Sequence, residues 1–286
     1  MFEKVKEVAL PQGTVSPWPS NLAVCWLDTR NITYVAVIQS NNIHVGNWDN
    51  KAETEVSWDT ISTSEPSTPN EKVIDVTAVG LVHPNARNFP VVIVGSARFI
   101  NVYDVKKVSN KPLFSITLAS ALRDHVTAVG RDVGPYCRGI SLCFQEHRSA
   151  IADIATCRYD EVTASADSNG ELIIWQKPVK GVGSKVLTKQ PINVINVLRK
   201  QSAYVLTSSE DGTFIVSKLH TRKPHAYQVE YRFSDADPYN IIMGAQFTNG
   251  RGSAIAVAAF DSNCLSMYKI VKKASNAAAA SSTSSS

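Results

Sequence analysis

The feature of this sequence that most constrains its fold is a β-hairpin pattern that recurs along the chain. Ile151–Pro178 shows it most completely: a β-rich run precedes a turn at Ala166–Gly170, and a second run, Leu172–Trp175, follows at once. An Asp, Asn and Gly turn between two β-rich runs is typical of a hairpin. The second run is apolar on both faces, so we expect it to be buried on both faces.

Four other segments repeat this pattern of two β-rich runs with a polar turn between them. They are Tyr34–Asp49, Val91–Asp104, Tyr204–Leu219 and Ser253–Ile270. The five hairpins end near residues 49, 104, 175, 219 and 270, at intervals of 55, 71, 44 and 51 residues. One blade of a β-propeller takes roughly 40–50 residues, so this period predicts an all-β propeller.

One hairpin carries the signature of a known repeat. Ser165–Trp175 (SADSNGELIIW) resembles a WD repeat, because an Asp-containing turn precedes an apolar strand that ends in Trp. Glu146-His147 falls where that family has its Gly-His pair. More narrowly, three stretches resemble the family of WD repeat-containing protein 54, in the same order along the chain: Asn21–Val37, Ile151–Trp175 and Ser208–Ile270. The resemblance implies a WD40-type β-propeller.

The number of blades follows from chain length and from one long interval. Members of that family look seven-bladed, whereas 286 residues supply about six blades at the observed period. The interval between Asp104 and Trp175 is too long for one blade and too short for two, and a further stretch is missing between Pro191 and Ala203 relative to the family. We expect six to seven blades, one or more of them degenerate or shortened. An open ring would expose strand edges.

The chain is expected to form one domain with a tail. Residues 1–271 are predicted to make a single propeller, and residues 272–286 (KKASNAAAASSTSSS) an Ala/Ser-rich disordered tail that cannot bury enough surface to fold. In propellers the first strand often completes the last blade. Lys4–Leu10 is therefore predicted to pair beside Ser266–Ile270.

Four residues form the candidate site. By resemblance to WD repeats, a structural tetrad would run from Asp167 to His147, then to Ser165 and to the indole N–H of Trp175. Buried polar groups need such partners. The same Ser, His and Asp types also occur in hydrolase triads. In a blade, however, the Ser and Trp lie inside the packing and no oxyanion site is evident, so we expect a structural role.

The following blade departs from the tetrad. It keeps Ser209 and Asp211 but has Ser217 where the Trp would stand. It cannot build the full tetrad, so the sequence predicts that this blade depends on packing alone.

Composition excludes several other classes of function. The chain is 44% apolar and 19% charged, with a net charge of +4, which is ordinary for a soluble domain and does not demand a nucleic-acid or membrane partner. Five scattered cysteines without CxxC spacing fit free thiols in a reducing compartment. No Walker loop, HExxH or GxSxG motif is present, so no cofactor or metal is expected. No run of about 20 apolar residues and no signal peptide is evident, so a cytoplasmic location without membrane insertion is expected.

The expected function is that of a non-catalytic WD-repeat scaffold for protein–protein interactions in a multiprotein assembly. Radial repetition leaves a broad, rigid rim of loops, and loops on a rigid frame are suited to binding. This step is an analogy between folds. An RNA-binding propeller subunit is the alternative, but the basic runs Lys106-Lys107 and Arg222–His225 are short and lack interleaved aromatics. An enzyme would need a deep pocket with convergent ionisable groups.

Overall fold

The computed structural model describes the chain with gaps. Described are residues 2–18, 21–52, 55–63, 76–96, 99–106, 110–117, 151–157, 162–167, 169–176, 185–189, 194–199, 203–220, 229–236 and 240–271. Within these ranges the chain forms five four-stranded antiparallel sheets and one short 3-10 helix, η1 (Asp28–Arg30). The all-β prediction is confirmed.

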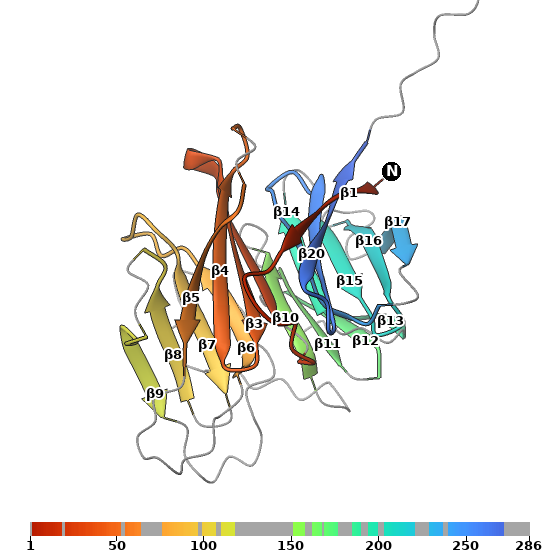
Figure 1. The fold of residues 1–286 in the computed structure, drawn as a ribbon. Coiled ribbons are helices and arrows are strands. Elements are labelled where there is room, and N and C mark those ends of the chain that lie inside the picture. The colour runs from red at the N-terminus through yellow and green to blue at the C-terminus, as the bar shows by residue number, and fades with distance from the viewer. Residues whose placement is uncertain are drawn as a thin grey trace, which may run out of the picture.

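Each sheet is one blade (Figure 1). Blade 1 contains β2 (Leu22–Leu27), β3 (Ile32–Gln39), β4 (Asn42–Asp49) and β5 (Ser57–Ser62). Blade 2 contains β6 (Val76–Val82), β7 (Val91–Ser96), β8 (Phe99–Asp104) and β9 (Phe114–Thr117). Blade 3 contains β10 (Ile151–Cys157), β11 (Val162–Asp167), β12 (Glu171–Gln176) and β13 (Lys185–Lys189). Blade 4 contains β14 (Val194–Arg199), β15 (Ala203–Ser208), β16 (Thr213–Leu219) and β17 (Val229–Ala236).

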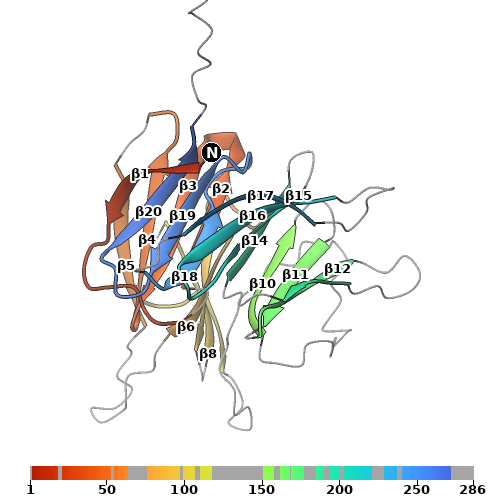
Figure 2. The same ribbon diagram turned by 90° about the vertical axis from the view of Figure 1, so that its right-hand side faces the viewer.

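Blade 5 is built from both ends of the described chain. Its strands are, from the inside outward, β18 (Ile242–Phe247), β19 (Ala254–Ala259), β20 (Cys264–Ile270) and β1 (Phe2–Ala9). β1 pairs antiparallel with β20 from Phe2 opposite Ile270 to Ala9 opposite Cys264, with an irregularity between Lys4 and Lys6. Figure 2 shows β1 lying along β20. The predicted closure of the last blade by the first strand is confirmed.

The five hairpins that the sequence predicted are the second and third strands of the five blades. β3 is rich in β-branched and aromatic residues and is buried along almost its whole length, as expected for a strand covered on both faces. Burial falls from the inside of a blade outward: β6 is almost fully buried, whereas all four residues of β9 are exposed. Two turns use glycine where the backbone is left-handed, at Gly170 (φ 78°) and Gly212 (φ 81°).

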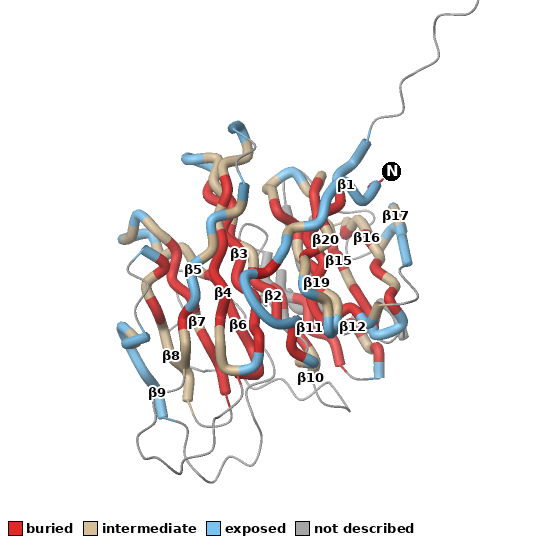
Figure 3. The backbone as a smooth tube through the Cα atoms, viewed as in Figure 1, coloured by how far each residue is buried: buried red, intermediate tan, exposed pale blue. Residues whose placement is uncertain are grey.

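The hydrophobic core lies between adjacent blades. One cluster of buried side chains joins blades 1 and 2, a second joins blades 3 and 4, a third joins blades 5 and 1, and a fourth joins blades 4 and 5. Figure 3 shows the corresponding continuous burial along the inner and middle strands. Stability of each blade therefore depends on its neighbours, as in other radial repeat architectures.

The order of the blades is set by contacts between inner strands. β10 contacts β14, β14 contacts β18, β18 contacts β2, and β2 contacts β6. No comparable contact joins β6 to β10 in the described part of the chain, and residues 118–150, which connect blades 2 and 3, lie outside it. The described residues thus account for five blades of the six to seven predicted. The shortened blade expected in that interval lies outside the described residues.

The tail predicted over residues 272–286 lies outside the described residues. Among the described residues, no helix is long and apolar enough to cross a membrane.

Candidate functional site

The predicted tetrad is only partly contained in the described structure. Ser165 and Asp167 lie in β11, and both side chains are buried. Trp175 lies in the neighbouring strand β12, one position before its last residue. His147 lies outside the described residues. The hydrogen bonds that would join the four residues therefore remain a prediction.

The structure shows what the Asp167 carboxylate does in its own turn. Its Oδ1 atom accepts hydrogen bonds from the backbone N–H groups of Asn169 (3.0 Å) and Glu171 (2.9 Å). The Gly170 N–H donates to the Asp167 carbonyl at 3.0 Å. Asp167 is fully buried, and a buried carboxylate is tolerated where it accepts several such bonds. This residue thus fixes the β11–β12 hairpin locally, whatever else it contacts.

The matching turn of blade 4 has a different polar arrangement. The Gly212 N–H donates to the Ser209 carbonyl at 3.2 Å, as Gly170 does to Asp167, so Ser209 occupies the position of Asp167. Asp211 sits two residues later, where its Oδ1 accepts the Ser209 hydroxyl and the Thr213 N–H (2.9 Å). The Ser209 hydrogen bond is the main cause that lowers the pKa of Asp211. The prediction that this blade depends on packing alone was therefore incomplete, because a carboxylate ties its turn as well.

A seam between the last and first blades was not predicted from the sequence. Along β18 and its continuation, Gly244, Gln246 and Gly250 face blade 1, and the backbone carbonyl of Thr248 accepts a hydrogen bond from that blade. A Cβ atom on Gly244 would lie 2.5 Å from the Cβ of Leu22, and one on Gly250 would lie 2.0 Å from the Trp26 ring. Glycine is required at both positions because the two blades approach too closely for a side chain.

Between those glycines, Gln246 bridges the two inner strands. Its Oε1 accepts the Val24 N–H and its Nε2 donates to the Leu22 carbonyl, both at 2.8 Å. The amide thus satisfies backbone groups of β2 on the side where no strand pairs with it. The sequence MGAQFTNG indicates that one face of this segment is unusual, because small and polar residues recur at every second position. It does not reveal which blade that face contacts.

A polar network around Trp48 extends the same seam. The Trp48 indole N–H donates to Asn50 Oδ1 at 3.0 Å, and Asn50 Nδ2 donates to the Thr33 hydroxyl at 2.9 Å. Thr33 in turn donates to the Thr248 carbonyl of blade 5 at 3.0 Å. In blade 1, a tryptophan indole is thus held by Asn and Thr rather than by a Ser–His–Asp set, and the chain of bonds ends in the next blade.

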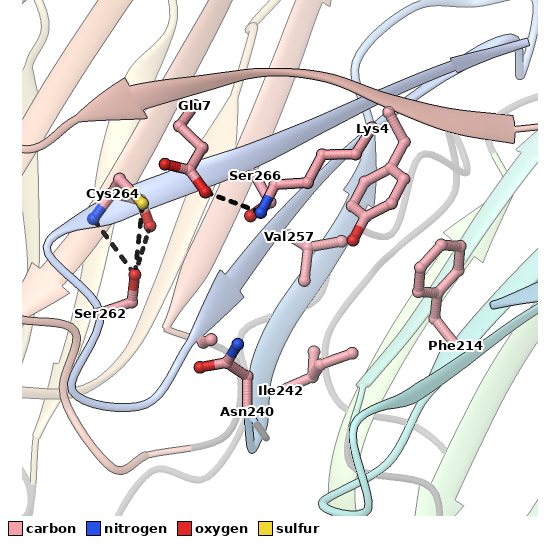
Figure 4. A pocket seen from close by; sticks show the side chains of 11 residues that line it. Lys4, Glu7, Phe214, Asn240, Ile242, Val257, Ser262, Cys264 and Ser266 are labelled. Atoms are coloured by element: carbon pink, nitrogen blue, oxygen red, sulfur yellow. Dashed lines mark hydrogen bonds and ion pairs between the residues drawn. The ribbon is translucent and has the colours of Figure 1, made fainter. Parts of the chain in front are cut away.

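A small hollow lies beneath β1, between blades 5 and 4 (Figure 4). Its volume is about 60 Å³, and its apolar lining includes Phe214, Ile242 and Val257. At its edge, Lys4 Nζ and Glu7 Oε1 form an ion pair at 2.7 Å, which lowers the pKa of Glu7. A ligand pocket is usually several times larger. Nor do the described residues hold any group of three His, Cys, Asp or Glu side chains placed to share a metal ion.

Comparison with known proteins points to the fold. No family model matches the sequence, and no curated protein matches it. Among solved structures, a chain of the "Crystal Structure of Mitotic Checkpoint Complex" resembles this one over 95% of this chain and 94% of that chain, with a TM-score of 0.58 and 11% sequence identity. The chain is a β-propeller.

A sequence identity of 11% supports a shared fold and nothing about function. For this propeller, the comparison supports an all-β propeller fold, while the narrower resemblance to the family of WD repeat-containing protein 54 rests on the sequence stretches alone. The structure adds the seam between blades 5 and 1, which the sequence did not predict.

Proposed function

We propose that this propeller is a non-catalytic WD-repeat scaffold that mediates protein–protein interactions within a multiprotein assembly. The observation that carries the proposal is the pairing of β1 with β20, which joins both ends of the described chain in blade 5. Loops on such a rigid frame are suited to binding. The similar solved chain comes from a structure of a protein complex, which is consistent with such a role.

Three finer points belong to the same proposal. The chain is a relative of WD repeat-containing protein 54, it acts in the cytoplasm, and blade 3 contains the tetrad of His147, Ser165, Asp167 and Trp175 as a structural element. The buried positions of Ser165 and Asp167 support the last point, because neither side chain is placed for contact with a substrate. The first rests on the sequence stretches, and the second on the five scattered cysteines without CxxC spacing, which fit free thiols in a reducing compartment.

Affinity purification tests the proposal. The tagged full chain is purified from native lysate, washed at increasing salt with and without nuclease, and the co-purifying proteins are quantified by mass spectrometry. A scaffold predicts protein partners in near-stoichiometric amounts that survive high salt and nuclease. Partners lost together on nuclease treatment would favour the RNA-binding alternative. Recovery of chaperones alone would contradict the proposal.

A further inference from the structure

One end of blades 1 and 2 carries a cluster of two cations around an aromatic ring, and the role inferred for it rests on the proposed scaffold function. A single aromatic ring, Phe89, lies in the β6–β7 loop and packs against the core between blades 1 and 2. The guanidinium carbon of Arg30 lies 4.9 Å from its centroid, and Nζ of Lys106 lies 4.6 Å from it. Both distances are within the range of cation–π attraction. Two exposed cations from different blades are thus gathered over one ring.

These residues come from three segments at the same end of the propeller. Arg30 ends η1 between β2 and β3, Phe89 lies between β6 and β7, and Lys106 follows β8 by two residues. In Figure 1 the three segments meet the upper ends of blades 1 and 2. The cluster therefore spans the junction between two blades rather than the surface of one.

A neighbouring carboxylate, that of Asp104, holds the backbone of Lys106 in place but does not neutralise the charges of Arg30 and Lys106. Asp104 forms an ion pair with Arg87 through Oδ2, and its Oδ1 accepts the backbone N–H of Lys106 at 2.9 Å. That carboxylate is thus committed to a third cation and to the backbone. Within the part of the chain that the structure describes, neither Arg30 nor Lys106 forms an ion pair with a carboxylate, and this includes Asp28 in the same short helix as Arg30.

From this geometry we propose that Arg30, Phe89 and Lys106 form a docking site for an acidic peptide segment of a partner protein. Closely spaced Glu or Asp side chains would supply the anionic oxygens that the two cations lack. The ring holds both cations in place before binding, so less side-chain entropy is lost when the partner arrives.

A peptide fits the cluster better than a nucleic acid. Binding to single-stranded nucleic acid combines a track of cations along the backbone with aromatic faces on which bases stack. Here the cluster offers two cations with which no described carboxylate forms an ion pair, and both lie over the aromatic ring. The chain as a whole carries a net charge of only +4.

Fluorescence anisotropy with the full chain tests the site. The probes are a fluorescein-labelled octapeptide of alternating Glu and Asp, its counterpart of Gln and Asn, and a labelled single-stranded DNA octamer. The acidic peptide is expected to bind, and more weakly at about 300 mM than at about 50 mM salt because charges are screened. The neutral peptide is expected not to bind.

Two double variants with the same change in net charge separate the site from general attraction. Arg30→Gln with Lys106→Gln is expected to weaken binding of the acidic peptide about tenfold or more. Lys6→Gln with Arg251→Gln removes two exposed cations that are not part of the cluster and is expected to change it by less than about twofold. Phe89→Leu, which keeps apolar packing, is expected to give an intermediate loss.

Several results would overturn the site. They are an absence of binding by the acidic peptide, equal losses in the two double variants, or tighter binding of the DNA octamer with the same dependence on Arg30 and Lys106. Near-ultraviolet circular dichroism of each variant confirms that it is folded. Failure here while the affinity purification still yields salt-resistant partners would reject this docking site and leave the scaffold function standing.

Discussion

At the scale of single residues, the seam between blades 5 and 1 makes a sharp prediction. Gly244→Ala would place a Cβ 2.5 Å from the Leu22 Cβ, and neither strand can move without disturbing its blade. We expect a loss of about 1–3 kcal/mol in the free energy of unfolding, measured by urea denaturation. Met243→Leu, at the adjacent buried position, is the control and should cost less. Equal effects of the two substitutions would contradict the close approach.

The Gln246 amide offers a second prediction at this scale. Gln246→Leu would leave the Leu22 carbonyl and the Val24 N–H without their partner, at a cost of about 1–3 kcal/mol. Gln39→Leu is the matched control, because the Gln39 amide is buried and neither of its polar atoms has a hydrogen-bond partner among the described residues. The control should be neutral or stabilising in the same denaturation assay. A greater loss for Gln39→Leu than for Gln246→Leu would show that the amide bridge is not the stabilising element.

Asp167 tests both the turn and the proposed tetrad. Asp167→Ala should cost about 1–3 kcal/mol by leaving the N–H groups of Asn169 and Glu171 unpaired, whereas Asp167→Asn keeps an acceptor oxygen and should cost less. The tetrad is tested by a double-mutant cycle with His147→Ala. Coupling between the two substitutions supports an Asp167–His147 bond, and additive effects on the unfolding free energy would refute the tetrad.

At the scale of elements, β1 should control the stability of the ring. Deleting residues 1–12 removes the whole outer strand of blade 5 and exposes the edge of β20 along its full register. We expect a sharp fall in melting temperature, which differential scanning fluorimetry would measure. Deleting residues 272–286 is the control, and no change is expected. An unchanged melt after loss of β1 would show that the first strand does not close the blade.

The sequence predicted elements better than it predicted contacts between them. The hairpins and the β1–β20 pairing were accessible because alternating apolar runs and Asp, Asn and Gly turns are local signals, and because a propeller constrains where its first strand goes. The Gln246 bridge and the Arg30–Phe89–Lys106 cluster were missed. Both join residues far apart in sequence, and a single sequence does not state which blades face each other.

At the scale of the whole molecule, stability and function are expected to be coupled through closure. Each described core cluster lies between two blades, so the loops at the rim keep their positions only while neighbouring blades stay packed. A binding surface that spans blades should therefore be lost when the ring opens, even if every residue of that surface is present. Blade number was harder to predict than blade type, because it depends on the interval 118–150 rather than on the repeated hairpins.

The measurement that tests the central claim most directly compares the partners of three forms of the chain: the full chain, the form lacking residues 272–286, and the form lacking residues 1–12. Each is tagged, purified from native lysate at high salt and analysed by quantitative mass spectrometry. A closed scaffold predicts the same near-stoichiometric partners for the first two forms and their loss from the third. The account would be contradicted if the full chain held no such partners, or if the form without β1 retained them.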